Sequence, residues 1–211
     1  MTLINDSQYL HLKIEALKER GILNDIQIIE LGQKGMITPF VSESINVNEH
    51  GEKILSYGVS SFGYDIRLAP TVKVFANPDI ILDPKNFDES IFYELEINKD
   101  DTGEYVILPP HSFALGHTIE TFDIPDNIMC LCTCKSTLAR ISLNLNSTTF
   151  EPTFFGQITL ELTNPSDNFM KVYVNEGCGQ VLFFKGEKPS ITYADRKGKY
   201  QNQSGITGAK V

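Results

Sequence analysis

Short segments in which apolar and polar residues alternate dominate the chain from about residue 35 onward, separated by Gly, Pro, Asn and Asp. Alternation with a period of two is typical of half-buried β-strands, and the separating residues are typical of turns. The pattern predicts strands at 63–68, 71–75, 105–108, 112–121, 128–134, 157–163, 171–174 and 180–184. Because the strands follow one another without regular βαβ alternation, we expect a mainly β fold, such as a sandwich, jelly roll or small barrel.

The first 35 residues follow a different pattern, in which apolar side chains recur at helical spacing. A second short helix is predicted after Asn24 and Asp25, closing near Gly32, because Asn and Asp are good N-caps and Gly ends helices. The first helix is defined by Leu10, Ile14 and Leu17, with Asp6 or Ser7 as its cap and Gly21 as its end.

The last residues, 193–211, contain three glycines and few large apolar side chains. Such a segment is expected to be flexible and able to order over a ligand. From residue 185 to the end of the chain, six Lys or Arg residues occur with only two acidic residues, Glu187 and Asp195.

A chain of 211 residues can form one β-rich domain. We therefore expect a single domain, 1–211, with a helical part at 1–35 and a C-terminal flap at 193–211.

The net charge of -9 argues against binding to a nucleic acid polymer, which usually needs a broad field of Lys and Arg. A small anionic ligand remains possible, since the basic residues gather near the C-terminus. No apolar run approaches the roughly 20 residues of a membrane-spanning helix, and the N-terminus has neither a basic start nor an apolar signal core. We expect no membrane association and a cytoplasmic location.

Three of the four cysteines alternate in the segment IMCLCTC, as Cys130, Cys132 and Cys134. A period of two places them on one face of a strand, where free Cys behaves as a small buried hydrophobe. Zinc sites prefer CxxC spacing or added His, and the HxE and PCxxC signature of the zinc nucleoside deaminases does not occur in the sequence. We expect a packed strand face and no zinc or other metal site.

Two segments carry candidate chemistry. Lys135, Ser136, Thr137 and Arg140 bring two cations and two hydroxyls together, a composition suited to phosphate oxygens. A solvated helical turn would have the same composition. In the segment ITLEL, Ile158, Leu160 and Leu162 share one face of a strand and Glu161 lies on the other. Glu161 is then either a surface residue or part of a pocket or subunit interface, and periodicity does not choose between these.

Seven segments in order resemble the dCTP deaminase branch of the trimeric dUTPase superfamily, from about Leu23 to the C-terminus. They are SSFGYDIRLAP, DPKNF, LPPHSFALGHTIETFDIP, CKSTLAR, NLNSTTFEPTFFGQITLELTN, NEGCGQVLFF and YADRKGKYQNQSG. The resemblance implies a dUTPase-like distorted β-barrel or jelly roll, a homotrimer with sites shared between subunits, and zinc-independent deamination of dCTP to dUTP and ammonia. It also implies Mg²⁺ bound chiefly to the nucleotide triphosphate.

By the same resemblance, Glu161 is the carboxylate that shuttles protons, with its pKa raised by burial. Ser136 would hold the attacking water, and Arg140 would orient Glu161 and offset charge in the intermediate. Phosphate binding is assigned to Lys135 and Thr137, together with Tyr193, Lys199 and Gln203 from the flap. Backbone groups around Thr148 and Thr149 would read the pyrimidine edge.

Some positions depart from the family pattern beside the expected base pocket. Ser142 stands where many relatives have Gly, and Thr149 stands where Pro or a small residue is usual. A dCMP or a 5-modified deoxycytidine nucleotide is therefore an alternative substrate. A second alternative is a bifunctional enzyme that also hydrolyses dUTP to dUMP and pyrophosphate. Glu151 lies near the place of the water-activating Asp of a dUTPase, but its side chain is longer.

Overall fold

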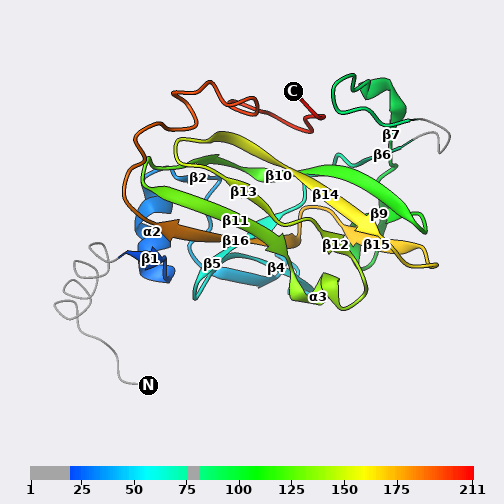
Figure 1. Cartoon of the computed structure of the whole chain (residues 1–211). Helices are drawn as coiled ribbons and strands as arrows, with labels where there is room; N and C mark the ends of the chain where they lie inside the picture. Colours follow the sequence, from blue (N-terminus) through cyan, green and yellow to red (C-terminus); the bar gives the residue numbers. More distant parts are fainter. Residues whose placement is uncertain (1–19, 76–80) are drawn as a thin grey trace.

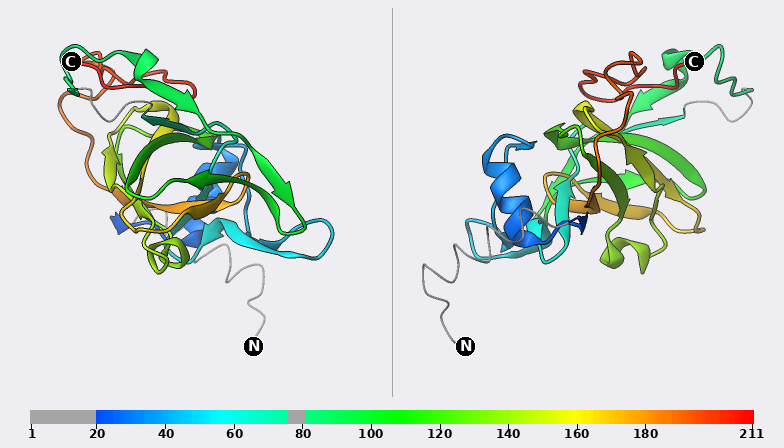
Figure 2. Two further views of the ribbon diagram at one scale, coloured as in Figure 1. Left: turned by 90° about the vertical axis from the view of Figure 1, so that its right-hand side faces the viewer. Right: turned by 60° about the vertical axis from the view of Figure 1, so that its left-hand side comes forward.

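The computed structural model describes residues 20–75 and 81–211, and Figure 1 shows that these form a layered β structure. One sheet has the strand order β13-β11-β16-β5-β4-β3, with β1 added to β16. A second sheet has the order β12-β14-β10-β6-β7, with β2 added to β10, and a third small sheet has the order β15-β9-β8. Figure 2 shows the sheets wrapping around a common interior, so the mainly β fold expected from the sequence is confirmed.

The bounds of the strands are as follows. The first sheet contains β1 (Gly21–Ile22), β3 (Ser44–Val47), β4 (Lys53–Ser60), β5 (Gly63–Arg67), β11 (Ile128–Cys134), β13 (Thr148–Phe150) and β16 (Gly177–Lys185). The second contains β2 (Ile37–Thr38), β6 (Lys73–Phe75), β7 (Phe92–Glu94), β10 (Ser112–Asp123), β12 (Asn144–Leu145) and β14 (Phe155–Asn164). The third contains β8 (Asn98–Asp100), β9 (Gly103–Leu108) and β15 (Met170–Tyr173). Within residues 20–75 and 81–211 the helical elements are α2 (Asp25–Gln33), α3 (Ser136–Ala139) and the 3-10 turn η1 (Glu89–Ile91).

Each of the predicted strands is present. In most of them the alternating apolar side chains enter the interior, whereas in β5 the residues from Gly63 to Ile66 are all buried. The core is formed by these inward side chains, and its largest fully buried members include Tyr64, Phe122 and Phe183. The cysteine face is confirmed as a packed face. Cys130 and Cys132 are fully buried, Cys134 is half-buried, and all are free thiols. Burial raises the pKa of the Cys132 thiol to about 12.

The helix α2 confirms the second predicted helix. Asn24 caps it by accepting from the backbone N–H of Gln27, and the side chain of Gln27 accepts from the N–H of Asn24 in return. The first predicted helix, with Leu10, Ile14 and Leu17, lies outside the described residues. Gly21, which was expected only to end that helix, pairs with Lys185 as the start of β1. The expected 1–35 helical part therefore contains a short strand.

A buried ion pair joins the two large sheets. The carboxylate of Glu120 is fully buried and accepts from the backbone N–H of Arg67 at 3.0 Å and from its Nε at 2.8 Å. Burial raises the pKa of Glu120, and the Arg67 hydrogen bonds oppose that shift. Glu120 lies where the pairing register of β10 with β14 shifts, between His117 and Thr121. Beyond this irregularity, residues 121–123 of β10 pair with residues 155–157 at the start of β14.

In the described ranges no helix is long and apolar enough to cross a membrane. Within the same ranges no group of three or more His, Cys, Asp or Glu side chains is arranged to hold a metal ion.

Candidate active site

Glu161 lies near the end of β14, on the face of the strand that points away from the core. Ile158, Leu160 and Leu162 are buried on the inner face, whereas Glu161 is half-buried on the outer one. The orientation expected from the alternation is therefore confirmed. Pairing with β10 places Leu115 directly opposite Glu161.

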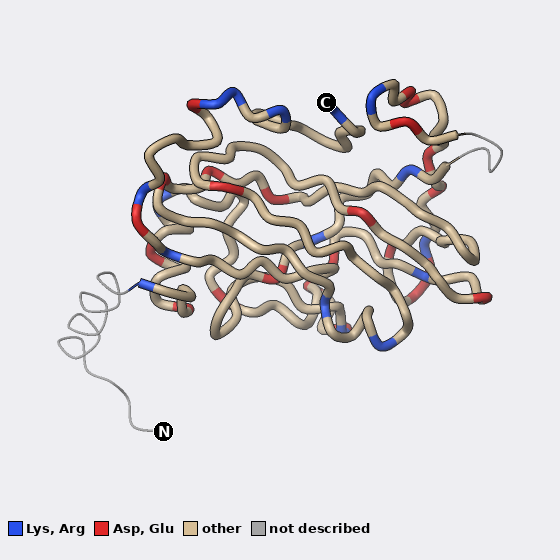
Figure 3. Tube along the Cα trace, in the orientation of Figure 1, with Lys and Arg blue, Asp and Glu red and all other residues tan. Residues whose placement is uncertain are grey.

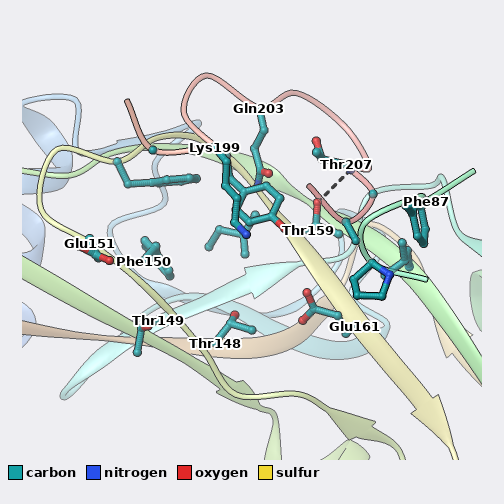
Figure 4. A pocket seen from close by; sticks show the side chains of 18 of the residues that line it. Phe87, Thr148, Thr149, Phe150, Glu151, Thr159, Glu161, Lys199, Gln203 and Thr207 are labelled. Carbon is teal, nitrogen blue, oxygen red and sulfur yellow. Dashed lines mark hydrogen bonds between the residues drawn. The ribbon is translucent and has the colours of Figure 1, made fainter. Parts of the chain in front are cut away.

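The outer face of β14 borders a cavity of about 870 Å³. One wall is aromatic, and its rings are stacked: the centroids of Phe75 and Phe92 are 4.6 Å apart, and those of Phe75 and Phe113 are 5.4 Å apart. The other walls combine apolar side chains with several polar ones. Figure 4 shows their origins: Glu161 and Thr159 come from β14, Thr148 and Thr149 from β13, and Lys199 and Gln203 from the C-terminal segment.

The carboxylate of Glu161 lacks a hydrogen-bond partner for one of its oxygens among the described residues. That oxygen, Oε2, is buried. Burial raises the pKa of Glu161 above its ordinary value, because the ionised form loses solvation. A buried oxygen without a partner is costly unless a ligand or another chain supplies one. The group is therefore suited to exchanging protons with a molecule bound in the cavity.

The strand β13 supplies the wall next to Glu161. Among the described residues it is the terminal strand of its sheet and pairs only with β11, with Thr149 opposite Leu131 and Thr148 opposite Cys132. A terminal strand has backbone N–H and C=O groups on its free edge. Such groups can form hydrogen bonds with the edge of a planar, polar ligand.

The C-terminal segment, residues 193–211, covers the cavity, and we call it the lid. Lys and Arg positions follow the lid along the top of Figure 3. The hydroxyl of Tyr193 accepts from the N–H of Tyr200, and Lys199 Nζ donates to the backbone carbonyl of Lys210 at 2.7 Å. Arg196 forms an ion pair with Glu151 at the rim of the cavity. The predicted flap is thus seated over the pocket.

The structure brings together six of the predicted site residues: Glu161, Thr148, Thr149, Tyr193, Lys199 and Gln203 all line the cavity. The other four do not line it in the described chain. They belong to or flank α3, which lies below the sheets in Figure 1, whereas the lid lies above them.

The residues around α3 have contacts of their own. Arg140 Nη1 donates to the carbonyl of Ser136 at 3.0 Å, and Lys135 Nζ pairs with Asp65. Ser136, Thr137 and Arg140 are exposed, so their side chains are free to contact another molecule. Ser142, just after α3, has a φ of 72°, a left-handed conformation that favours Gly. This explains why Gly suits that position.

Sequence reasoning did not identify the aromatic wall or the contacts of the lid with β14. Phe75, Phe87, Phe92 and Phe113 come from separate segments, and no local pattern links them. Gln157 and Thr159, however, alternate with Glu161 on the same face of the strand. That alternation was the available signal that they lie on the pocket side.

A layered β structure with a half-buried carboxylate in a pocket under a basic lid is the arrangement expected of a protein of the dUTPase-like fold. The crystal structure of 2′-deoxycytidine 5′-triphosphate deaminase from Agrobacterium tumefaciens has this fold, and the two chains superpose with a TM-score of 0.55 at 14% identity. The match covers 79% of this chain and 48% of that one.

Sequence comparison identifies the family within this fold class. The family model described as dCTP deaminase-like matches residues 22–186. The dCTP deaminase of Campylobacter curvus is 46% identical over 194 residues, which is 90% of this chain and 98% of that protein. The dCTP deaminase of Acidovorax sp. strain JS42 is 49% identical over 181 residues, covering 85% and 93%. This chain belongs to the dCTP deaminase-like family.

Proposed function

We propose that this protein catalyses the hydrolytic deamination of dCTP to dUTP and ammonia. The observation that carries the proposal is the half-buried carboxylate of Glu161. Its buried Oε2 has no partner in the described chain, and it lines a cavity between a free strand edge and a basic lid. Membership of the family, with relatives called dCTP deaminase that match over nearly their whole length, supports the choice of reaction.

The chemistry requires protons to move between water, the ring and the amine. Glu161 takes a proton from water, the hydroxide adds to C4, and the proton passes to N3. A second proton then moves from the hydroxyl on C4 through Glu161 to the amine, the C4–N bond breaks, and ammonia leaves. One water is consumed, and Glu161 returns to its ionised form. A carboxyl with a raised pKa suits these alternating roles near neutral pH.

The other cavity residues have roles that follow from their chemistry. Backbone groups at Thr148 and Thr149 bind the pyrimidine edge, because β13 ends its sheet. Lys199, Gln203 and Tyr193 of the lid bind the phosphates or the sugar. The nucleotide enters as its Mg²⁺ complex, with the ion held mainly by phosphate oxygens. The reaction takes place in the cytoplasm, where the free nucleotides are.

The protein acts as a homotrimer in which α3 of one subunit completes the site of its neighbour. Ser136 and Arg140 are exposed and lie outside their own chain's cavity, while Glu161 has a buried oxygen that needs a partner. In the trimer, Ser136 of the neighbour holds the attacking water, and Arg140 orients Glu161. Lys135 and Thr137 reach the phosphates from the same segment.

The reaction is tested by measuring ammonia release and nucleotide products with dCTP, dCMP, CTP and 5-methyl-dCTP, with and without Mg²⁺. We expect dCTP with Mg²⁺ to be the preferred substrate and dUTP to accumulate with ammonia in equal amounts. Accumulation of dUMP and pyrophosphate would instead identify a bifunctional enzyme. Faster turnover of dCMP or 5-methyl-dCTP would identify that nucleotide, in place of dCTP, as the substrate. Absence of ammonia release from all four nucleotides would overturn the proposal.

The shared site is tested by complementation between two inactive variants. Ser136→Ala and Glu161→Gln, co-expressed in equal amounts, should regain activity. Each mixed trimer has one subunit interface at which an unmodified Glu161 of one subunit meets an unmodified Ser136 of its neighbour. Random assembly gives about a quarter of the unmodified activity. Each variant alone serves as the background. If α3 served the cavity of its own chain, the mixture would stay at that background.

A further inference from the structure

The lid follows the outer face of β14 in a regular series of hydrogen bonds. The N–H of Gly205 donates to Oε1 of Gln157 at 2.6 Å, and the N–H of Thr207 donates to Oγ1 of Thr159 at 3.1 Å. Figure 4 shows the second of these bonds. The lid therefore runs parallel to β14, and a step of two residues along the lid matches a step of two residues along the strand. The next outward residue of the strand is Glu161, and both it and Ala209 line the cavity.

Gln157 is the residue where this series begins, and it holds the lid through its backbone as well. Its N–H donates to the carbonyl of Gln203 at 3.0 Å, and Nε2 of Gln203 donates back to the carbonyl of Gln157 at 2.5 Å. The preceding Gly156 forms a parallel bridge with Gln203. A Cβ atom on Gly156 would lie 2.7 Å from the Gln203 carbonyl oxygen, so the backbones are in close contact.

The other end of the Gln157 side chain is attached to the protein interior. Its Nε2 donates to the carbonyl of Thr118 at 2.9 Å. Thr118 is fully buried, and its hydroxyl donates to the carbonyl of Glu120 and accepts from the N–H of Ile158. These bonds fix the carbonyl that Gln157 contacts. The amide of Gln157 is therefore held in one orientation, with its oxygen toward the lid.

We propose that Gln157 is a positioning residue that seats the lid and thereby sets the affinity for the nucleotide without taking part in the chemical step. This inference rests on the proposed function. Of the described residues, those lining the cavity do not include Gln157, so its effect on a bound nucleotide must pass through the lid. Lys199 and Gln203 lie on the lid that Gln157 anchors, and both line the cavity.

The first experiment compares Gln157→Leu with the unmodified protein in dCTP deamination. Leu removes the bonds to Gly205 and Thr118 while keeping a side chain of similar size. We expect the KM for dCTP to rise about 10-fold, the effect of weakening one or two hydrogen bonds, with kcat changed by less than about two-fold. Thr163→Val is the control, because Thr163 lies on the same face beyond the hydrogen-bonded series. It should leave both constants unchanged.

The second experiment measures lid seating without relying on turnover. Lys197 and Lys199 are exposed, and because a protease needs an extended stretch of chain, trypsin should cut after them faster when the lid leaves its seat. In the absence of nucleotide, we expect cleavage of Gln157→Leu about 10-fold faster than that of the unmodified protein. In a Glu161→Gln background, protection should require about 10-fold more dCTP when Gln157 is also replaced.

A second variant guards against a folding defect in Gln157→Leu. Gln157→Glu keeps an acceptor for Gly205 but cannot donate to Thr118 when ionised, and its effects should have the same direction. Unchanged KM and unchanged cleavage in both variants would overturn the inference, as would a lower kcat with an unchanged KM. If the unmodified protein releases no ammonia, the proposed function fails, whereas cleavage without nucleotide still tests the seating of the lid.

Discussion

Glu161→Gln is expected to lower kcat for ammonia release from dCTP by about 10²- to 10⁴-fold, the range for loss of a general acid–base group. The amide keeps the size of the side chain but cannot take a proton from water. Nucleotide binding should persist, since the lid and β13 are unchanged. Ammonia release measures the first effect, and calorimetric titration with dCTP measures the second.

The pH profile gives a second readout of the same variant. Burial raises the pKa of Glu161 above its ordinary value of 4.5. The carboxylate is the form that accepts a proton, so kcat should fall as the pH falls through the raised pKa. The acidic limb should thus lie above pH 4.5 and be absent from the residual activity of the variant. Glu104→Gln, on β9, is the control, and activity of Glu161→Gln near that of this control would remove Glu161 from its role.

Deleting residues 197–211 is expected to raise the KM for dCTP by about 100-fold or more. The deletion removes Lys199 and Gln203, and one charged and one neutral hydrogen bond together contribute about 3 kcal/mol. It also leaves the outer face of β14 uncovered, since Gly205 and Thr207 no longer bind Gln157 and Thr159. Saturation curves of ammonia release measure the change.

Two point variants separate the parts of this effect. Lys199→Met removes a cation that lines the cavity and should account for part of the rise in KM. Lys188→Ala removes a cation paired with Asp126, outside the cavity lining, and should have no effect. Unchanged saturation behaviour after the deletion would exclude the lid from substrate binding.

The alternation of apolar and polar residues predicted those strands in which one face is buried, including the orientation of Glu161 on β14. It did not predict β4, in which the side chains from Ile54 to Ser60 are all at least half-buried, without alternation. Gly58 in that strand has a φ of 99° and lies close to the Glu43 carbonyl, which breaks the regular pattern. Strands of this kind are defined by their neighbours and not by their own sequence.

The candidate site was predictable in part. The family resemblance identified the site residues of β13, β14 and the lid, and these lie together within a single chain. The four residues at and beside α3 are separated from the cavity within the chain, so their roles stay predictions that depend on a second subunit. The aromatic wall depends on the packing of β6, β7 and β10, which sequence patterns do not specify.

The in-step path of the lid along β14 limits how the length of this segment can vary. Gly205 and Thr207, two positions apart, donate their backbone N–H groups to the side chains of Gln157 and Thr159. Inserting one residue between Gln203 and Gly205 would turn the N–H groups of Gly205 and Thr207 away from their acceptors, because neighbouring backbone groups point to opposite sides. Two inserted residues would restore the direction, but only by looping out from the strand. Length changes are therefore better tolerated outside the stretch that follows the strand, such as at the bend at 190–191.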